Sequence, residues 1–280
     1  MSRDEARNSY RPFCEFDSVG KTTRERTTGI DSRQVIHIFP DADRLVQALT
    51  ADILRISREA VRSRGKCFIA LSGGSVLHLL HSGLWLFRQT LDIGWSSWHV
   101  FWVDERHVPW NSPDSNYGEA KRLFLDHVPI RKDHIHPVPE SPDVDEAAPA
   151  YEECLRKVLP LHGADVPRFD IVLLGVGEDG HTASLFPGHD ALFEDHRLVV
   201  PVRQAPKPPP DRVTMTLPML CAARSIFFCV TGIHKADVVA RILANPQPIS
   251  ALPAQMVHPT DGNLLWMMDR EAAHRWERQG

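Results

Sequence analysis

The stretch that decides the fold is residues 169–187, FDIVLLGVGEDGHTASLFP. An apolar run, Ile171–Leu174, leads directly into three glycines with acidic residues and His181 among them. A short apolar run that ends in glycines is typical of a strand buried on both faces, as in a parallel sheet. In open α/β sheets, ligands bind where the carboxyl ends of such strands leave the sheet. We therefore expect His181 to lie beside a ligand-binding crevice.

His181 has two carboxylates close to it in the sequence, Glu178 and Asp179. A carboxylate that binds one ring nitrogen fixes the imidazole tautomer and leaves the other nitrogen able to take a proton from water. We predict His181 as such a hydrolytic base, while the sequence does not decide which carboxylate orients it. The alternative is a glycine turn with a capping Asp179 and a structural histidine. D-G-H alone does not exclude this alternative, because short motifs often occur by chance.

Working outward from this stretch, predicted strands alternate with predicted helices along the chain. The strands are 35–39, 67–71, 98–103, 198–202, 225–230 and 263–268, and the helices are 41–64, 76–87, 117–127, 151–159, 235–244 and 270–278. This alternation predicts an α/β protein with a three-layer, mostly parallel sheet flanked by helices. Residues 1–33 lack apolar periodicity and are expected to form a poorly ordered tail before an α/β domain at 34–280. Residues 137–149 are expected to be a proline-punctuated linker.

Three segments are candidates for binding a phosphate. A strand, a glycine turn and a helix follow one another at 67–87, an order that directs backbone N–H groups and the positive helix end at an anion. The turn consists of Ser72, Gly73, Gly74 and Ser75. It is neither a dinucleotide fingerprint nor a Walker loop, and a plain strand-to-helix turn is the alternative. Arg212 begins an alternating strand, and Lys235 lies in the first turn of a helix, where an anion would offset its charge; a solvated surface lysine is the alternative.

Charged residues also follow the predicted strand 98–103, in the run Asp104-Glu105-Arg106-His107. Four ionisable side chains at one strand end are costly to bury, so they should face a cleft or pair with one another. An Asp–Arg salt bridge that stiffens the loop is the structural alternative. The stiff loop 206–210, PKPPP, could flank the same site.

The composition limits the possible functions. The formal net charge of −4 over 280 residues argues against nucleic-acid binding, and no apolar stretch approaches the roughly 20 residues of a membrane span. The five cysteines are scattered, which suggests buried thiols in a reducing compartment and hence a cytoplasmic location. Among the fifteen histidines no metal-binding spacing appears, and His134 and His136 are interpreted as structural or exposed.

In their order and spacing these segments resemble the glucosamine-6-phosphate isomerase/6-phosphogluconolactonase superfamily, and within it the 6-phosphogluconolactonases. The resemblance covers residues 35–268 and depends on the motifs L-S-G-G-S (71–75), V-D-E-R-H-V-P (103–109), S-N (115–116), G-V-G-E-D-G-H-T-A-S-L-F-P (175–187), R-V-T-M-T (212–216), G-I-H-K (232–235) and A-L-P-A (251–254). One departure is Ser75-Val76, where many members have Thr-Pro; the serine keeps the hydroxyl.

The resemblance implies a Rossmann-like fold of the glucosamine-6-phosphate isomerase type and hydrolysis of 6-phospho-D-glucono-1,5-lactone in the pentose phosphate pathway. It implies His181 as the base, Asp179 as its orienting carboxylate, and Asp104 and Arg106 beside the reacting ring. The phosphate would be held by the glycine turn, Arg212 and Lys235. No metal or organic cofactor is implied, and the protein is expected to be a monomer or small homo-oligomer.

Two other functions fit parts of the same pattern. The amino-sugar-phosphate isomerases and deaminases resemble one another in G-H-I-A-F-N-E-P, whereas this chain has Phe186 in place of the carboxylate before the proline. A phenyl ring cannot ionise, which disfavours an isomerase. A non-catalytic sugar-phosphate sensor would need a DNA-binding module, and residues 1–33 show no helix-turn-helix pattern.

Overall fold

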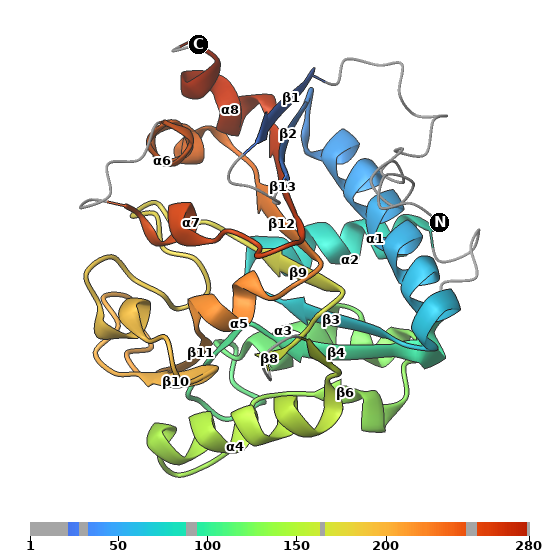
Figure 1. Ribbon diagram of the computed structural model, residues 1–280, viewed down its shortest axis with the longest axis vertical. Helices are drawn as coiled ribbons and strands as arrows, with labels where there is room; N and C mark the ends of the chain where they lie inside the picture. Colours follow the sequence, from blue (N-terminus) through green and yellow to red (C-terminus); the bar gives the residue numbers. More distant parts are fainter. Residues whose placement is uncertain (1–21, 28–32, 88–93, 163–165, 245–250, 279–280) are drawn as a thin grey trace.

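The computed structural model describes residues 22–27, 33–87, 94–162, 166–244 and 251–278. A sheet of eight strands runs through them in the order β1-β2-β13-β12-β9-β3-β4-β6. The strands are β1 (Thr22–Thr27), β2 (Arg33–Phe39), β13 (Asn263–Asp269), β12 (Ser225–Val230), β9 (Ile171–Leu174), β3 (Cys67–Leu71), β4 (Trp98–Trp102) and β6 (Ile135–His136). Every neighbouring pair is parallel except β1 with β2. The predicted mostly parallel α/β sheet is therefore confirmed (Figure 1).

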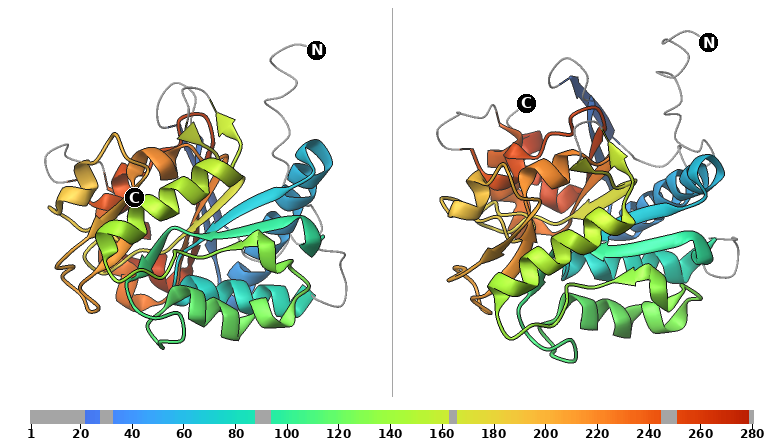
Figure 2. Two further views of the ribbon diagram at one scale, coloured as in Figure 1. Left: turned by 90° about the horizontal axis from the view of Figure 1, so that it is seen from below. Right: turned by 60° about the horizontal axis from the view of Figure 1, so that its bottom comes forward.

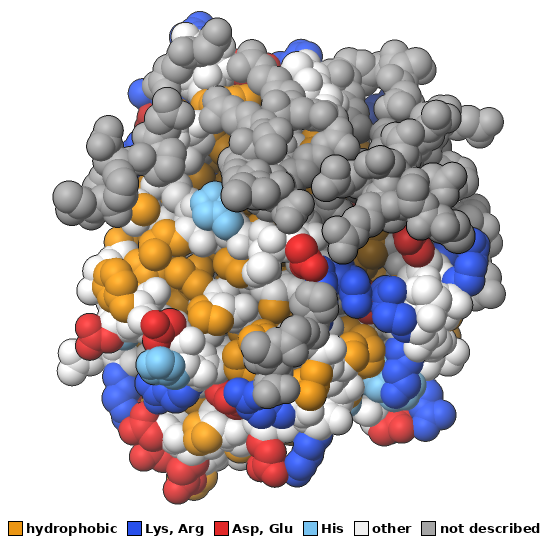
Figure 3. Space-filling model, viewed as in Figure 1, with side chains coloured by type: hydrophobic (Ala, Val, Ile, Leu, Met, Phe, Trp, Pro, Cys, Tyr) orange, Lys and Arg blue, Asp and Glu red, His pale blue; other side chains and the backbone are white. Residues whose placement is uncertain are grey.

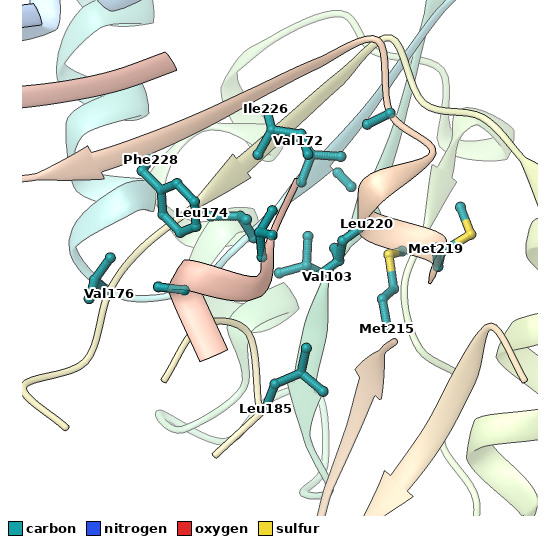
Figure 4. Close-up of a cluster of buried hydrophobic side chains, with 14 of the residues drawn as sticks. Val103, Val172, Leu174, Val176, Leu185, Met215, Met219, Leu220, Ile226 and Phe228 are labelled. Carbon is teal, nitrogen blue, oxygen red and sulfur yellow. The ribbon is translucent and has the colours of Figure 1, made fainter. Parts of the chain in front are cut away.

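Helices cover both faces of this sheet, which gives the three predicted layers (Figure 2). The helices are α1 (Ala42–Arg64), α2 (Ser75–Phe87), α3 (Asn116–Leu123), α4 (Val144–Val158), α5 (Leu217–Cys221), α6 (Ala236–Leu243), α7 (Pro253–Met256) and α8 (Arg270–Glu277). Strand β9 shows how the layers form. Ile171 and Leu173 pack in the core with α1, α2 and α3, whereas Val172 and Leu174 pack in the other core with α4, α6 and α8. Val172 and Leu174 lie together in one buried cluster (Figure 4). Successive side chains of a strand point to opposite faces, and both faces of β9 are apolar because both are covered.

A second sheet adjoins the carboxyl ends of the large one. It consists of β10 (Val199–Val202), β11 (Arg212–Met215) and β5 (Asp104–Arg106), all antiparallel. Strand β5 follows β4 after a single residue, so the chain passes directly from one sheet into the other. In the β11–β5 register Arg212 is opposite Arg106 and Thr214 is opposite Asp104. The run of charged residues after β4 is therefore paired backbone, where a loop was predicted, and its residues lie beside Arg212.

Two other predicted segments differ from the structure. Strand β1 lies inside the stretch 1–33 that was predicted to be a poorly ordered tail; Arg33 begins β2, and residues 1–21 and 28–32 lie outside the described residues. Its sequence, TTRERT, contains no apolar residue, and it is an edge strand formed through antiparallel pairing with β2. Helix α4 begins at Val144, within the predicted linker, and contains Pro149. Asp143 caps its first turn, and buried alanines offset the hydrogen bond that the proline cannot donate.

Three histidines are stacked at the amino-terminal ends of β4 and β6. His99 is buried, its ring lies 3.8 Å from that of His134, and its Nδ1 is 3.1 Å from Nε2 of His136. Burial lowers the pKa of His99 to about 3 and that of His136 to about 4. Neighbouring histidines and Lys66 lower both pKa values further, whereas Asp133 raises them. The folded protein therefore holds the rings of His99 and His136 neutral.

We expect this stack to make the protein acid-sensitive. Unfolded histidines take up protons near pH 6.5 and the folded ones only near pH 4 and below, so stability is lost as the pH falls through that window. From pH 7 to pH 5, His99 alone should lower the free energy of unfolding by about 2 kcal/mol, measured by urea denaturation. His99→Phe, which keeps an aromatic ring without a titrating group, should reduce this drop. An equal drop in both proteins would contradict the assignment.

Candidate active site

A cavity of about 220 Å³ lies at the carboxyl ends of β3 and β9, against β5 and β11. All the site residues predicted from the sequence line it except Asp179, which reaches it through His181; the lining members are Ser72, Gly73, Gly74, Ser75, Asp104, Arg106, His181, Arg212 and Lys235. These residues come from separate segments of the chain. The parallel strands of the large sheet end on this side, and β5 and β11 of the second sheet add Asp104, Arg106 and Arg212.

His181 and Asp179 form a hydrogen-bonded pair between Nδ1 and Oδ1. Asp179, and not Glu178, is thus the carboxylate that contacts the ring, which the sequence left open. With Nδ1–H donating to Asp179, Nε2 is the nitrogen that remains to accept a proton. Burial lowers the pKa of His181, and the hydrogen bond to Asp179 opposes this without reversing it. The imidazole is therefore neutral at physiological pH, as a general base must be.

The glycine turn after β9 places the ring. The N–H of Gly177 donates to the carbonyl of His181 at 2.8 Å, and the N–H of Gly180 donates to the carbonyl of Gly177 at 2.9 Å. Gly180 adopts a φ of +89°, which favours glycine. A Cβ at Gly177 would lie 2.0 Å from ring atoms of His181, so the imidazole rests directly on this glycine.

Asp104 and Arg106 have partners other than each other. Oδ2 of Asp104 accepts a hydrogen bond of 2.6 Å from the hydroxyl of the buried Ser184. Nη1 of Arg106 donates to the backbone carbonyl of Asp114 at 2.8 Å. The stiffening salt bridge considered from the sequence is therefore not what holds them, and both side chains line the cavity.

Glu105, between them, is a residue whose role the sequence did not indicate. It is 3% exposed and accepts the backbone N–H groups of Arg106, Asn116 and Tyr117 and the hydroxyl of Ser115. Burial raises the pKa of Glu105 to about 7, although the hydrogen bonds from the backbone act to lower it. Glu105 thereby fixes the start of α3 to β5. The amide of Asn116 in turn donates to the carbonyl of Asp104.

The predicted phosphate turn lies at the start of α2. Gly74 has a φ of +61°, and its N–H donates to Oε2 of Glu119 at 3.2 Å. Gly73 packs on Asn116, whose Oδ1 a Cβ would approach to 1.8 Å. In the described part of the chain, three buried polar atoms of residues that line this cavity have no hydrogen-bond partner: Ser72 Oγ, Arg106 Nε and Asn116 Oδ1. Unpaired buried polar atoms are rare in proteins, and three beside one cavity support a ligand there.

Arg212 has most of its donors occupied by the protein itself. Its Nε donates to the carbonyl of Pro209 at 3.1 Å, and its Nη2 to those of Lys207 and Pro208 at 3.0 and 3.2 Å. Nη1 lies 3.4 Å from Ser184 Oγ. Arg212 therefore lines the cavity and also holds the loop that precedes it.

That loop carries Lys207, a cation whose role the sequence pattern did not indicate. Its Nζ lies 3.6 Å from Oδ1 of Asp179, and its side chain lines the cavity. The one sequence signal was the stiff loop 206–210 beside the predicted site. Lys235, at the end of the 3-10 helix Ile233–Lys235, lines the same cavity. Burial lowers the pKa of Lys235, an effect that the nearby Glu178 opposes.

No three His, Cys, Asp or Glu side chains in the described ranges are grouped so that they could hold a metal ion. Of the helices within these ranges, none has both the length and the apolar character to cross a membrane. A space-filling view shows hydrophobic side chains on one face as patches interrupted by charged residues (Figure 3).

The chain is similar to several known proteins along most of its length. The chain is 38% identical over 249 residues to probable 6-phosphogluconolactonase 2 of Oryza sativa subsp. japonica, covering 85% of this chain and 88% of the relative. It is 40% identical over 247 residues to 6-phosphogluconolactonase of Mycobacterium tuberculosis, covering 85% and 96%. Among solved structures, 6-phosphogluconolactonase from Trypanosoma brucei matches with a TM-score of 0.75 at 31% identity, covering 85% and 97%.

A monomeric glucosamine-6-phosphate deaminase has the same fold, with a TM-score of 0.70 at 19% identity. The model of the family described as glucosamine-6-phosphate isomerases/6-phosphogluconolactonase matches residues 40–266. With this match over most of its length and relatives at 38–40% identity, the chain belongs to the glucosamine-6-phosphate isomerase/6-phosphogluconolactonase family.

Proposed function

We propose that the protein is an enzyme that hydrolyses 6-phospho-D-glucono-1,5-lactone to 6-phospho-D-gluconate, in the oxidative branch of the pentose phosphate pathway. The observation that carries the proposal is the Asp179–His181 pair, which shares one cavity with a glycine turn and several cations. A lactone with a phosphate needs both parts: a base for water at the carbonyl, and positive groups for the phosphate dianion. The names of the relatives, most of them 6-phosphogluconolactonases, support the same reaction.

In the proposed mechanism, Nε2 of His181 takes a proton from water as the water oxygen attacks the lactone carbonyl carbon. The carbonyl oxygen becomes an oxyanion, which Arg106 is suited to stabilise because its Nε has no partner within the described chain. The bond from the carbonyl carbon to the ring oxygen then breaks. The imidazolium returns its proton to that leaving oxygen, which restores neutral His181. These groups suffice for the reaction, so we propose no metal or organic cofactor.

For the phosphate we propose the turn at Ser72–Ser75 together with Lys235 and Arg212. Ser72 Oγ is buried without a partner in the described residues, and Lys235 is an ammonium group partly removed from water. Arg212 can offer little more than Nη1, because its other donors bind loop carbonyls. A buried cation with few competing partners interacts more strongly with an anion than a solvated one. Lys235 should therefore contribute most to phosphate affinity.

An isomerase or deaminase remains the second candidate within the family, and one contact disfavours it. Phe186, at the position of the isomerase carboxylate, is 1% exposed and packs its ring 4.7 Å from that of His181. The apolar ring removes a proton-transferring group from the place where an isomerase needs one. It also adds to the desolvation that keeps His181 neutral.

The proposal is tested by mixing the enzyme with freshly prepared lactone and following proton release against the spontaneous rate. Acceleration that saturates with lactone is expected. The same preparation should release no ammonium from glucosamine 6-phosphate. Ammonium release without lactone hydrolysis would overturn the proposal in favour of the deaminase, and binding of either sugar phosphate without turnover would favour a sensor.

We expect Lys235→Ala to raise KM for the lactone by about 10–100-fold with a much smaller effect on kcat. Losing one charge-assisted contact to phosphate costs about 1.5–3 kcal/mol of binding free energy, and the loss is almost the same in the ground state and the transition state. Steady-state kinetics measure this, with Lys157→Ala as the control because that lysine is exposed and pairs with Glu153 on α4. A fall in kcat at unchanged KM would show that Lys235 acts on the reacting carbonyl.

We also propose a cytoplasmic location and a monomer or small homo-oligomer. Four cysteines in the described residues, Cys67, Cys154, Cys221 and Cys229, are free thiols, which suits a reducing compartment.

A further inference from the structure

Lys207 approaches the catalytic pair in a manner that the proposed reaction does not yet use. Its ammonium lies 3.6 Å from Oδ1 of Asp179, the oxygen that also binds Nδ1 of His181. One carboxylate oxygen therefore serves two cation-capable groups. The side chain of Lys207 is 46% exposed, so the pair is accessible to water and to salt.

The backbone at Lys207 is held by Arg212. Three N–H groups of Arg212 hold the carbonyls of residues 207, 208 and 209 at 3.0–3.2 Å. Arg212 is 5% exposed and belongs to β11, which pairs with β5. The second sheet thus fixes the backbone from which Lys207 extends toward Asp179. A planar guanidinium is suited to three carbonyls at once, whereas an ammonium is not.

We propose that Lys207 is a positioning residue for the Asp179–His181 pair, held there by Arg212, and that its charge opposes protonation of the His181 imidazole. The importance of Lys207 for catalysis rests on the proposed function. The competition for Oδ1 weakens the stabilisation that Asp179 gives to an imidazolium. The positive charge of Lys207 also repels that imidazolium directly.

The other charges around His181 set the sign of the expected effect. Asp179 and Asp104 raise the pKa of the imidazole, whereas burial and Lys207 lower it. Arg106, Arg212 and Lys235 line the same cavity and add positive charge. Removing the charge of Lys207 takes away one of the effects that lower the pKa of His181, so this pKa should rise.

The direct test is an NMR titration of the His181 ring in the free protein, assigned with His181→Gln. In Lys207→Met the midpoint should rise by about half a pH unit relative to wild type at low ionic strength, an effect expected for partly exposed charges a few ångströms apart. The rise should shrink in about 0.5 M salt. Lys207→Arg, which retains the charge, should titrate like wild type. Equal midpoints in Lys207→Met and wild type would overturn the proposal, whatever reaction the enzyme catalyses.

Kinetics then separate this role from phosphate binding. If Lys207 acts on His181, the acidic limb of kcat/KM in Lys207→Met moves to higher pH by the same amount. If Lys207 instead binds the phosphate, Lys207→Met raises KM across the whole pH range and the acidic limb of kcat/KM stays at the wild-type pH. This result would contradict the proposal. Arg212→Lys should move the limb in the same direction as Lys207→Met, because the loop loses its three-carbonyl clamp.

Discussion

Replacing His181 with alanine is expected to lower kcat for lactone hydrolysis by about 10²–10⁴-fold, the usual contribution of a general base. Nδ1 is bound to Asp179, so Nε2 alone can take the proton from water, and no other neutral imidazole lines the cavity within the described residues. KM should stay within about threefold of wild type, because the phosphate contacts proposed above do not involve this ring. Stopped-flow proton release, corrected for spontaneous hydrolysis, measures both constants.

Two further variants make this result specific. Asp179→Asn keeps the shape of the carboxylate but not its charge. Because Asp179 acts only through the imidazole of His181, this variant should lose less activity than His181→Ala. His196→Ala is the matched control, because its side chain is 92% exposed and lies away from the cavity. Wild-type turnover in His181→Ala, with the control also unchanged, would show that another group activates the water.

Local pattern and topology were enough to predict which segments meet at one edge of the sheet. Each strand of the parallel sheet that ends in a glycine or charged run places that run at the same edge, so residues 72–75, 104–106 and 181 were expected to meet. The contacts of Ser184 with Asp104 and of Lys207 with Asp179 were not foreseen. They join segments about 80 and 28 residues apart through side chains, and no periodicity encodes such pairs.

The same distinction explains the errors in the fold. Buried strands such as 67–71 and 225–230 were predicted with the bounds that the structure shows, because both faces are apolar. The prediction of a loop at β5 was wrong because its charged residues give no strand pattern; its partner β11 lies about a hundred residues away. The predicted start of helix α4 was too late, since Pro149 suggested a linker and outweighed the Asp143 cap and the buried alanines that follow it.

Replacing Gly177 with alanine is expected to lower kcat by about 10²-fold without unfolding the protein. The new Cβ would lie 2.0 Å from Cε1 and Nδ1 of His181 and 2.6 Å from Oδ1 of Asp179, closer than such atoms can approach. The ring, the carboxylate or both must move. A displacement of about 1 Å at a reacting group commonly costs about 10²-fold in rate. Gly177 is not among the glycines with positive φ, so alanine adds a steric clash and no backbone strain.

Gly65→Ala provides the opposite case and serves as the control. Gly65 ends α1 with a φ of +76°, and a Cβ added to it would meet no atom within 4 Å, so alanine there strains the backbone far from the cavity. It should reduce the free energy of unfolding by about 1 kcal/mol and leave kcat unchanged. Gly177→Ala should do the reverse, with a nearly native thermal unfolding curve and a poor kcat. If Gly177→Ala keeps kcat within about threefold of wild type, the imidazole does not need its place against this glycine, and the active geometry differs from the one described.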